Sequence, residues 1–375
     1  MTLKRSLAVL PLLLVAMAVI VFAACNDDDD DGDATATPGD GTATATVTDA
    51  PSGSHSQILQ DVLANGSLEC GINNSVPGFG NLLDDGSFAG FDIDYCRAIA
   101  AAVLGDSEAV NYTPLSASAR LTAVQTGQID VLIRNTTWTT TRDADTGLTF
   151  ATTTFFDGQG MMVRADSGFT SVDDVATATI CALEGTTTEA NLADRLPDAE
   201  LITFDNNDTL QTAFIETRCD GWTSDKSQLA GRRSEFPADS GGPAALVILE
   251  ESFSKEPLGP VTLDNDAQWS DIVNWVVIGT IAAEELGVTS SNVAAMAADP
   301  PNVSVARLLG VSFEGGDITD TGLDVEVDFM QDVLAQVGNY GEIYDDNITP
   351  IGIVREGTLN ALWTDGGLIY SPPFK

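Results

Sequence analysis

The chain has 375 residues, 43% of them hydrophobic, which is enough for a large core and about two domains. It carries 56 Asp and Glu against 16 Lys and Arg, a formal net charge of −40 at pH 7. Such a surface repels nucleic acid and anionic headgroups, and so excludes binding modes that neutralise phosphates with Lys and Arg.

The N-terminus has the pattern of an export signal. Lys4 and Arg5 precede an uncharged, mostly apolar run from Leu7 to Cys25, which ends in VFAAC. Small residues leading into a cysteine are typical of a bacterial lipobox, so we expect a lipoprotein signal peptide at residues 1–24 and lipidation of Cys25. The alternative is an uncleaved membrane helix, because the run is near the ~20 residues that a span needs. Both interpretations tether the rest of the chain outside the cytoplasmic membrane.

Residues 25–55 are expected to be a disordered acidic, Thr- and Ala-rich tether, because they contain few large apolar side chains. Their run DDDDDG matches the start of an EF-hand loop, but the position that requires Glu holds Pro38. The single histidine, His55, lies in this tether. His-based nucleophilic catalysis and His metal sites are therefore excluded from the folded body, and we expect no metal and no cofactor.

Four cysteines remain, an even number that suggests two disulfides outside the cytoplasm. Four cysteines allow three pairings, with four free thiols as the alternative. If each pair belongs to one domain, the pairs are Cys70–Cys96 and Cys181–Cys219. No CxxC spacing is present, which argues against a zinc or redox motif.

From residue 56, helical patterns alternate with short apolar strands, as in a mostly parallel sheet covered by helices. Helices are expected at 56–66, 95–105 and 118–127, and strands at 68–72, 109–115 and 129–133. Ligands of such sheets bind beyond the carboxyl ends of the strands. The stretch RNTTWTTTR, residues 134–142, begins directly after the last of these strands and is therefore a candidate ligand site.

The alternation restarts after residue 160 and predicts a second, smaller α/β unit that ends near residue 254. Its expected helices are 170–176, 186–196, 207–219 and 226–233, and its expected strands are 178–183, 200–205, 220–225 and 244–250. An extended segment at 257–263 follows. Helical patterns are then expected at 266–286, 291–297, 323–338 and 359–363.

Two of the scarce cations, Arg134 and Arg142, stand at the ends of the hydroxyl-rich loop. A guanidinium at Arg142 can form a bidentate pair with a carboxylate, which the loop's hydroxyl and N–H groups can share. The alternative is a solvated surface arginine. For Arg134 two interpretations stay open, a contact with a ligand side chain or a pair with a surface acid.

The second unit contains two complementary segments. In LEGTTTEANLA, residues 183–193, a Gly-Thr-Thr turn precedes a helix, where hydroxyls and free N–H groups favour an anion. Simple helix capping explains one of these threonines, and less well all three. Asp225 ends a predicted strand just before a helix and is either a helix cap or the partner of an ammonium group. An Arg for a carboxylate and an Asp for an ammonium suit a zwitterionic amino acid.

The chain resembles the substrate-binding proteins of amino-acid ABC importers, solute-binding protein family 3, over nearly all of residues 56–375. The resemblance is carried by segments that include CGINNSVPGFG, GFDIDYCRAIAAAVLGD, PLSASARLTAVQTGQIDVLIRNTTWTTTRD, EGTTTEANLAD and RCDGWTSD. RNTTWT, EPLGP and QVGNYGEI are similar to the branch that serves general L-amino-acid uptake.

The resemblance implies roles for the polar positions. Arg142 would take the ligand α-carboxylate, helped by Asn135 and Thr137 of the first lobe. Thr186 and Thr187 of the second lobe would add to carboxylate binding.

The same resemblance assigns the α-ammonium to Asp225. It also implies that the INNSVPGF segment lines the side-chain pocket, with Asn73 and Phe79 as contacts and Arg134 as a further candidate. Asn73 and Val76 stand where members for basic amino acids carry an acid and an aromatic residue. These departures favour a broad, less charged pocket over strict lysine or arginine specificity. Cysteine pairs within each lobe are a feature of the branch, which supports the pairing above.

The implied fold is an α/β, two-lobed periplasmic-binding-protein fold of type II. Two hinge strands near GQGMMV and EPLGPV would join lobe 1, residues 56–158 and 257–375, to lobe 2, residues 159–256. The implied protein is an extracytoplasmic, lipid-anchored monomer. It captures free L-amino acids of broad specificity and delivers them to an ABC importer permease with a cytoplasmic ATPase.

We expect no enzymatic activity and no nucleic-acid partner. The chain lacks a GxxxxGK[ST] loop and would not hydrolyse ATP itself. The alternatives are a dehydratase of the same fold acting on a prephenate-like acid, and an amino-acid sensor module, although the sequence shows no signalling parts.

Overall fold

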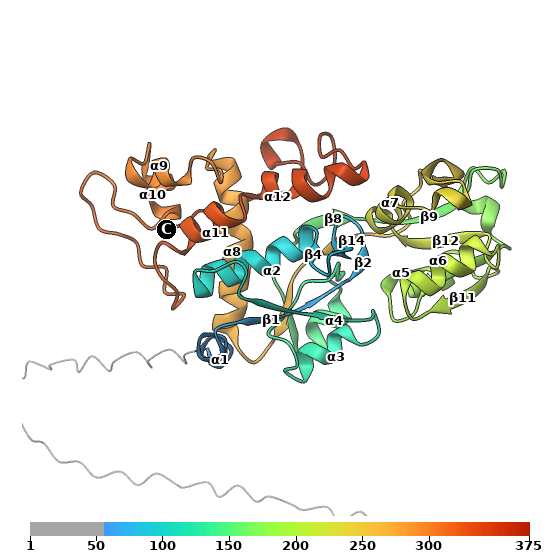
Figure 1. The fold of residues 1–375 in the computed structure, drawn as a ribbon, viewed down its shortest axis with the longest axis horizontal. Coiled ribbons are helices and arrows are strands. Elements are labelled where there is room, and N and C mark those ends of the chain that lie inside the picture. Colours follow the sequence, from blue (N-terminus) through green and yellow to red (C-terminus); the bar gives the residue numbers. More distant parts are fainter. Residues whose placement is uncertain (1–55) are drawn as a thin grey trace, which may run out of the picture. The chain divides into compact units, whose positions relative to one another are not determined.

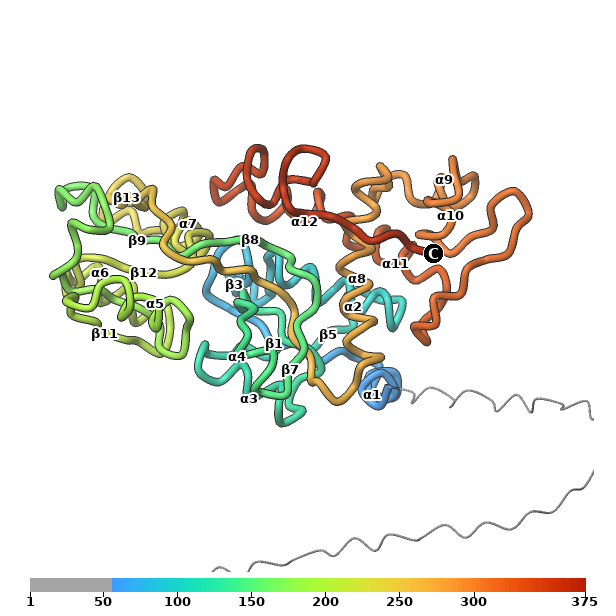
Figure 2. Tube along the Cα trace, turned by 180° about the vertical axis from the view of Figure 1, so that it is seen from behind, coloured from blue at the N-terminus to red at the C-terminus, as the bar shows by residue number. Residues whose placement is uncertain are grey.

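The computed structural model describes residues 56–375 (Figures 1 and 2). The predictions for the signal peptide, for lipidation of Cys25 and for the tether with His55 lie outside these residues. In the described part of the chain, no helix has the length and apolar character that crossing a bilayer requires.

The first sheet has the strand order β5–β1–β6–β15–β7. Its first three strands are parallel, whereas β15 runs antiparallel to both of its neighbours. The strands are β1 (Leu68–Ile72), β5 (Val110–Pro114), β6 (Val131–Leu132), β7 (Leu148–Phe150) and β15 (Val261–Leu263). A small antiparallel sheet follows β1 and contains β2 (Ser75–Val76), β3 (Gly80–Leu82) and β4 (Phe88–Ala89).

Two helices that accompany the first sheet end at glycines, and a capping side chain starts one of them. In α1 (Gln57–Asn65) the Ser56 hydroxyl accepts a hydrogen bond from the Leu59 N–H, and Gly66 ends the helix in the left-handed conformation. Gly105 ends α2 (Phe91–Leu104) in the same way. This helix begins at Phe91, four residues before the start predicted at residue 95. The next helices are α3 (Arg120–Gln125) and α4 (Thr140–Ala144), of which α4 was not predicted.

The second sheet has the order β11–β10–β12–β9–β13, again with three parallel strands beside antiparallel ones. Its strands are β9 (Gln159–Arg164), β10 (Thr179–Leu183), β11 (Glu200–Phe204), β12 (Gly221–Asp225) and β13 (Leu246–Ile248). Its helices are α5 (Thr187–Arg195), α6 (Asn207–Ile215) and α7 (Lys226–Ser234), with a 3₁₀ turn at Val172–Val175. The alternation predicted from the sequence is confirmed in this region.

The chain passes twice between the sheets, through an antiparallel pair formed by β8 (Phe155–Asp157) and β14 (Glu256–Leu258). Figures 1 and 2 show β8 between the two sheets. The prediction of a hinge strand at GQGMMV is wrong, because that stretch forms most of β9 inside the second sheet. We call β1–β8 with everything from β14 onward the first lobe, and β9–β13 with their helices the second lobe.

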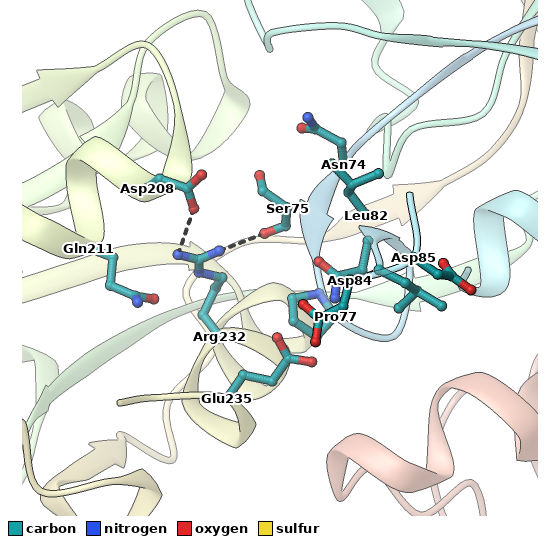
Figure 3. A pocket seen from close by; sticks show the side chains of 12 residues that line it. Asn74, Ser75, Pro77, Leu82, Asp84, Asp85, Asp208, Gln211, Arg232 and Glu235 are labelled. Atoms are coloured by element: carbon teal, nitrogen blue, oxygen red, sulfur yellow. Dashed lines mark hydrogen bonds and ion pairs between the residues drawn. The ribbon is translucent and has the colours of Figure 1, made fainter. Parts of the chain in front are cut away.

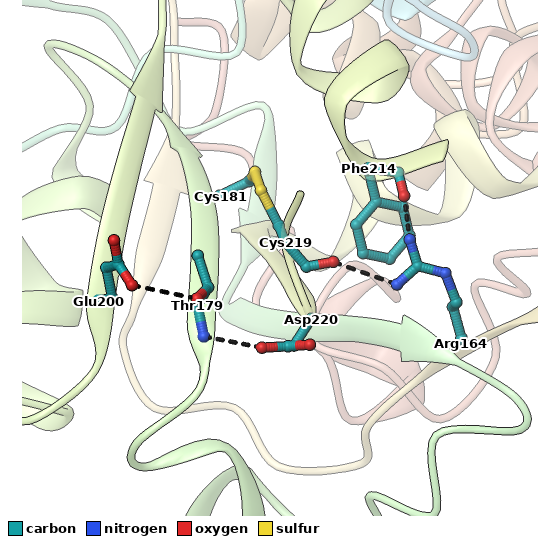
Figure 4. The surroundings of a disulfide bond; sticks show 7 residues. All are labelled: Arg164, Thr179, Cys181, Glu200, Phe214, Cys219 and Asp220. Carbon is teal, nitrogen blue, oxygen red and sulfur yellow. Dashed lines mark hydrogen bonds between the residues drawn. A yellow bond between two sulfur atoms is a disulfide. The ribbon is translucent and has the colours of Figure 1, made fainter. Parts of the chain in front are cut away.

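Each lobe contains one disulfide. Cys70 of β1 pairs with Cys96 of α2, with a Cα–Cα distance of 6.2 Å, and Cys181 of β10 pairs with Cys219 before β12, at 5.8 Å. Both distances suit a disulfide. Beside the second one, Arg164 donates to the carbonyl oxygens of Cys219, at 3.1 Å, and of Phe214 (Figure 4). The predicted pairing is confirmed.

The C-terminal part adds helices to the first lobe's core. They are α8 (Ala267–Glu285), α9 (Val293–Ala298), α10 (Val303–Leu308), α11 (Phe329–Gln336) and α12 (Tyr340–Asn347). The predicted helix at 323–338 begins only at Phe329, and Asp324 has a positive φ of 58°. The prediction of a helix at 359–363 is wrong, because that stretch forms a turn and a bend, followed by a β-bridge at Leu362 and the start of a 3₁₀ turn at Trp363. Tyr340 and Tyr344 of α12, which was not predicted, pack against Phe91 of α2.

Candidate functional site

The candidate site lies where segments that follow parallel strands of the two sheets meet. Asn135 and Thr137 follow β6 of the first lobe, Thr187 follows β10 of the second, and Asp225 ends β12. The hydroxyls of Thr137 and Thr187 are 3.3 Å apart, and Asn135 Nδ2 donates to Asp225 Oδ2 at 3.4 Å. The carboxyl ends of parallel strands from both sheets therefore meet at one place, as an open α/β ligand site requires.

Asn135 makes four hydrogen bonds, two within the first lobe and two to the second lobe. Its backbone N–H donates to Asp92 Oδ2 at 2.8 Å, and its Oδ1 accepts from Asn73 Nδ2 at 3.2 Å. Its Nδ2 donates to Asp225 and, at 3.2 Å, to Gln228 Oε1 in α7. Asn135 has a φ of +32°, a left-handed conformation that Asn tolerates better than most residues.

The Gly-Thr-Thr turn starts α5 and uses its three threonines differently. Thr186 is the helix cap, since its hydroxyl accepts from the Glu189 N–H at 3.0 Å. Thr187 does not cap the helix and instead donates to Glu256 Oε2 at 2.7 Å. Capping thus occupies one hydroxyl, and Thr187 points its own toward Thr137 and the hinge strand β14.

Asp225 stands before α7, but its side chain makes no capping hydrogen bond. It is 5% exposed. Burial, and then the nearby carboxylates of Asp157 and Glu256, raise the pKa of Asp225 well above its usual value. Among residues 56–375 it forms no ion pair with any lysine or arginine. A buried carboxylate of this kind is complementary to a cationic ligand group.

Two further buried acids lie behind the site. Burial raises the pKa of Asp92 to about 7, against the opposing effects of the Asn135 N–H and of Arg134. Burial also raises the pKa of Asp157 to about 6. The Asp157 carboxylate accepts from the N–H groups of Gly158 at 2.7 Å and Ser227 at 3.2 Å, so it fixes the junction between β8 and α7.

Arg142 lies in α4 and is 9% exposed, so the interpretation as a solvated surface arginine is wrong. Its Nη1 donates to the Thr137 carbonyl oxygen at 2.9 Å, and the Thr139 hydroxyl accepts from its backbone N–H at 3.2 Å. Burial lowers the pKa of Arg142, while Glu256 and Asp225 act in the opposite direction.

Arg134 is 5% exposed, and its Nε donates to the Leu115 carbonyl oxygen at 2.8 Å. Burial lowers the pKa of Arg134 to about 10, opposed by Asp92 and Asp225. The structure thus excludes the pairing of Arg134 with a surface acid.

Arg120 is a site residue that the sequence reasoning missed. It begins α3, is 3% exposed, and donates from Nη1 to the Arg134 carbonyl oxygen at 3.4 Å. Its helix follows the carboxyl end of β5. The rule that ligands bind beyond the carboxyl ends of the strands, which pointed to residues 134–142, could therefore have identified Arg120 as well.

A small cavity occupies the centre of this arrangement. Six of the predicted site residues line it: Arg134, Asn135, Thr137, Thr186, Thr187 and Asp225. The other lining residues are not among the predicted site residues: Arg120, Leu183, Thr188, Ser224 and Gln228. Two guanidinium groups thus border the cavity, which differs from the less charged pocket that the sequence predicted.

Three predicted residues do not border this cavity. Arg142 lies behind Thr137, as its hydrogen bond shows. Asn73 is buried and orients Asn135. Phe79 packs edge-on against Phe91 and Phe155 in the first lobe's core, with ring centroids 5.9 and 5.2 Å apart.

A second contact between the lobes lies at the edge of a neighbouring surface pocket (Figure 3). Arg232 of α7 donates to the Ser75 carbonyl oxygen in β2 at 3.0 Å and to Asp208 Oδ1 at 3.2 Å. Gly231, just before it, packs against Pro77 of the first lobe. The two lobes are therefore in direct contact.

Comparison with known proteins agrees with this architecture. Residues 68–342 match the bacterial extracellular solute-binding proteins, family 3. The chain belongs to this family. It is 43% identical to a general L-amino acid-binding periplasmic protein of Rhizobium johnstonii over 331 residues, 86% of this chain and 94% of the relative.

Two further members of the family are similar. A glutamate/glutamine/aspartate/asparagine-binding protein of Rhodobacter capsulatus is 43% identical over 324 residues, 84% of this chain and 93% of the relative. A solved ABC transporter/periplasmic binding protein from Brucella ovis, with glutathione bound, has a TM-score of 0.80 and 41% identity. That match covers 86% of this chain and 100% of the other.

Proposed function

We propose that this protein captures free L-amino acids in the space between its lobes and delivers them to the permease of an ABC importer. The family membership and the amino-acid-binding relatives support the proposal. Closure of two lobes around a ligand is a common mechanism of this architecture.

The observation that carries the proposal is the buried carboxylate of Asp225, which forms no ion pair within residues 56–375 and lies opposite the Arg- and Thr-rich segment of the first lobe. In this proposal Asp225 takes the α-ammonium group, and Arg142 takes the α-carboxylate with Thr137 and Thr187. Asn135 orients Asp225 and joins the lobes. Because Arg142 and Asp225 belong to different lobes, a zwitterion would hold both lobes together.

The proposal also includes a lipid anchor and the boundaries of the two lobes. Cys25 would carry the lipid that anchors a monomer outside the cytoplasmic membrane. The lobe boundaries would be 56–158 with 257–375, and 159–256. The strands that form each sheet support these boundaries except at Glu256, which begins β14 of the first lobe.

Titration calorimetry with a panel of L-amino acids tests the proposal. We expect saturable binding of L-amino acids, no binding of the matching amines or keto acids, and no product in the same samples. Turnover of a prephenate-like acid would instead support the dehydratase. Absence of binding for the whole panel would refute the proposal.

A further inference from the structure

Arg120 is the most poorly compensated charge at the cavity. It is 3% exposed, and its Nε has no hydrogen-bond partner in the described structure. Its one hydrogen bond, to the Arg134 carbonyl oxygen, is long at 3.4 Å. A buried guanidinium has five N–H donors, and leaving such donors unpaired is costly. The side chain nevertheless borders the cavity, where a ligand could reach it.

The charged groups around Arg120 do not compensate its positive charge. Burial, and then Arg134 and Arg142, lower the pKa of Arg120 well below its usual value, while Asp225 and Glu256 oppose this shift. Glu256 is itself occupied by Thr187 and Asn191, at 2.7 and 3.0 Å. No carboxylate of residues 56–375 forms an ion pair with Arg120 or Arg134.

The charged groups that border the cavity are Arg120, Arg134 and Asp225. Asp225 is the partner proposed for the α-ammonium, and Arg142, which lies outside the cavity, is the partner proposed for the α-carboxylate. Arg120 and Arg134 therefore have no anion unless the ligand carries a second carboxylate in its side chain. Asp92 partly compensates Arg134 from behind, so Arg120 depends most on the ligand.

We propose that Arg120 and Arg134 form a second anion subsite, which binds the side-chain carboxylate of an acidic L-amino acid. The inference rests on the proposed function and names its preferred substrate class. The α-carboxylate and α-ammonium keep the partners proposed above, and the side chain extends toward the carboxyl end of β5, where α3 begins. Guanidinium groups suit this role because they bind carboxylates through paired N–H donors.

L-glutamate and L-glutamine test the subsite, because they have the same shape and differ in the side-chain charge. Calorimetry on the purified protein should give at least about tenfold tighter binding of L-glutamate, since hydrogen bonds between charged groups are the stronger ones. Arg120→Gln should remove about 10- to 100-fold of the L-glutamate affinity and change the L-glutamine affinity far less. Arg97→Gln is the matched control, because Arg97 is a half-buried arginine of α2 that pairs with Asp94 and does not border the cavity, and it should change neither affinity.

The outcomes separate the two proposals. Preference of the unmodified protein for a neutral or basic amino acid overturns the acidic subsite and leaves amino-acid capture standing. Equal loss of both ligands in Arg120→Gln, with unchanged thermal unfolding, also overturns it, because the arginine would then act on the common α-groups. If Arg120→Gln does not fold, Arg134→Gln provides the same comparison of the two ligands.

Discussion

The contact between Gly231 and Pro77 predicts that a single added methyl group prevents full closure of the lobes. Gly231 lies within α7 of the second lobe, and a Cβ built there would lie 2.3 Å from the Pro77 carbonyl oxygen of the first lobe. Ordinary van der Waals contact begins at 3.4 Å. Gly231→Ala would therefore push the two backbones apart by about 1 Å. That shift would also stretch the neighbouring bond from Arg232 to Ser75.

The expected magnitude follows from two opposing effects. In a helix, Ala is more favourable than Gly by roughly 0.5–1 kcal/mol, so the second lobe itself should be no less stable. Overpacking of the contact between the lobes costs about 1–3 kcal/mol in the closed form alone. Ligand affinity should consequently fall about 5- to 150-fold.

Calorimetry with the best-bound amino acid measures this change, and stopped-flow release should show a faster dissociation rate. Ser234→Ala, an exposed position at the end of the same helix, controls for a general effect of alanine in α7. Unchanged affinity and dissociation rate in Gly231→Ala, with wild-type unfolding, would show that the ligand-bound form does not contain this contact.

Three other substitutions test the site. Arg142→Ala should abolish binding of every amino acid, because each carries the α-carboxylate, and micromolar affinity in the calorimeter would contradict this role. Arg134→Ala should change the ranking among side chains more than it weakens binding, and a uniform loss over a panel would move Arg134 to the α-carboxylate. Because Asp92 has a pKa of about 7 in the fold and ~3.9 unfolded, the folded state binds more protons between these values. The free energy of unfolding should therefore rise as the pH falls from 7 to 4. Asp92→Asn should reduce this slope in thermal melts, and an identical slope would be evidence against the buried carboxyl.

The sequence predicted those features that depend on local pattern. Alternating apolar strands and helices identified both sheets. The position after β6 pointed to residues 134–142, of which Arg134, Asn135 and Thr137 line the cavity. The pairing of four cysteines followed from their positions and the family resemblance.

Features that depend on contacts between distant segments could not be predicted in this way. Arg120 of α3 and Arg134 after β6 come together only in the folded first lobe. The loop residue Asn135 has a positive φ, and its N–H is held by Asp92 of α2. α12 was missed because its Tyr-Gly-Glu start has weak helical character, and packing of its tyrosines against α2 outweighs that preference.

The place of β15 determines an order of assembly for the chain. Within the first sheet, β15 lies between β6 and β7, yet it comes from residues 261–263, after the whole second lobe. The first sheet therefore cannot be completed until the second lobe has been synthesised, whereas all strands of the second sheet are contiguous in the chain. A growing chain can form the second lobe, with its disulfide, while β6 and β7 still lack their shared neighbour. Exposed edges of β6 and β7 during this interval are the part of the molecule most open to misassembly.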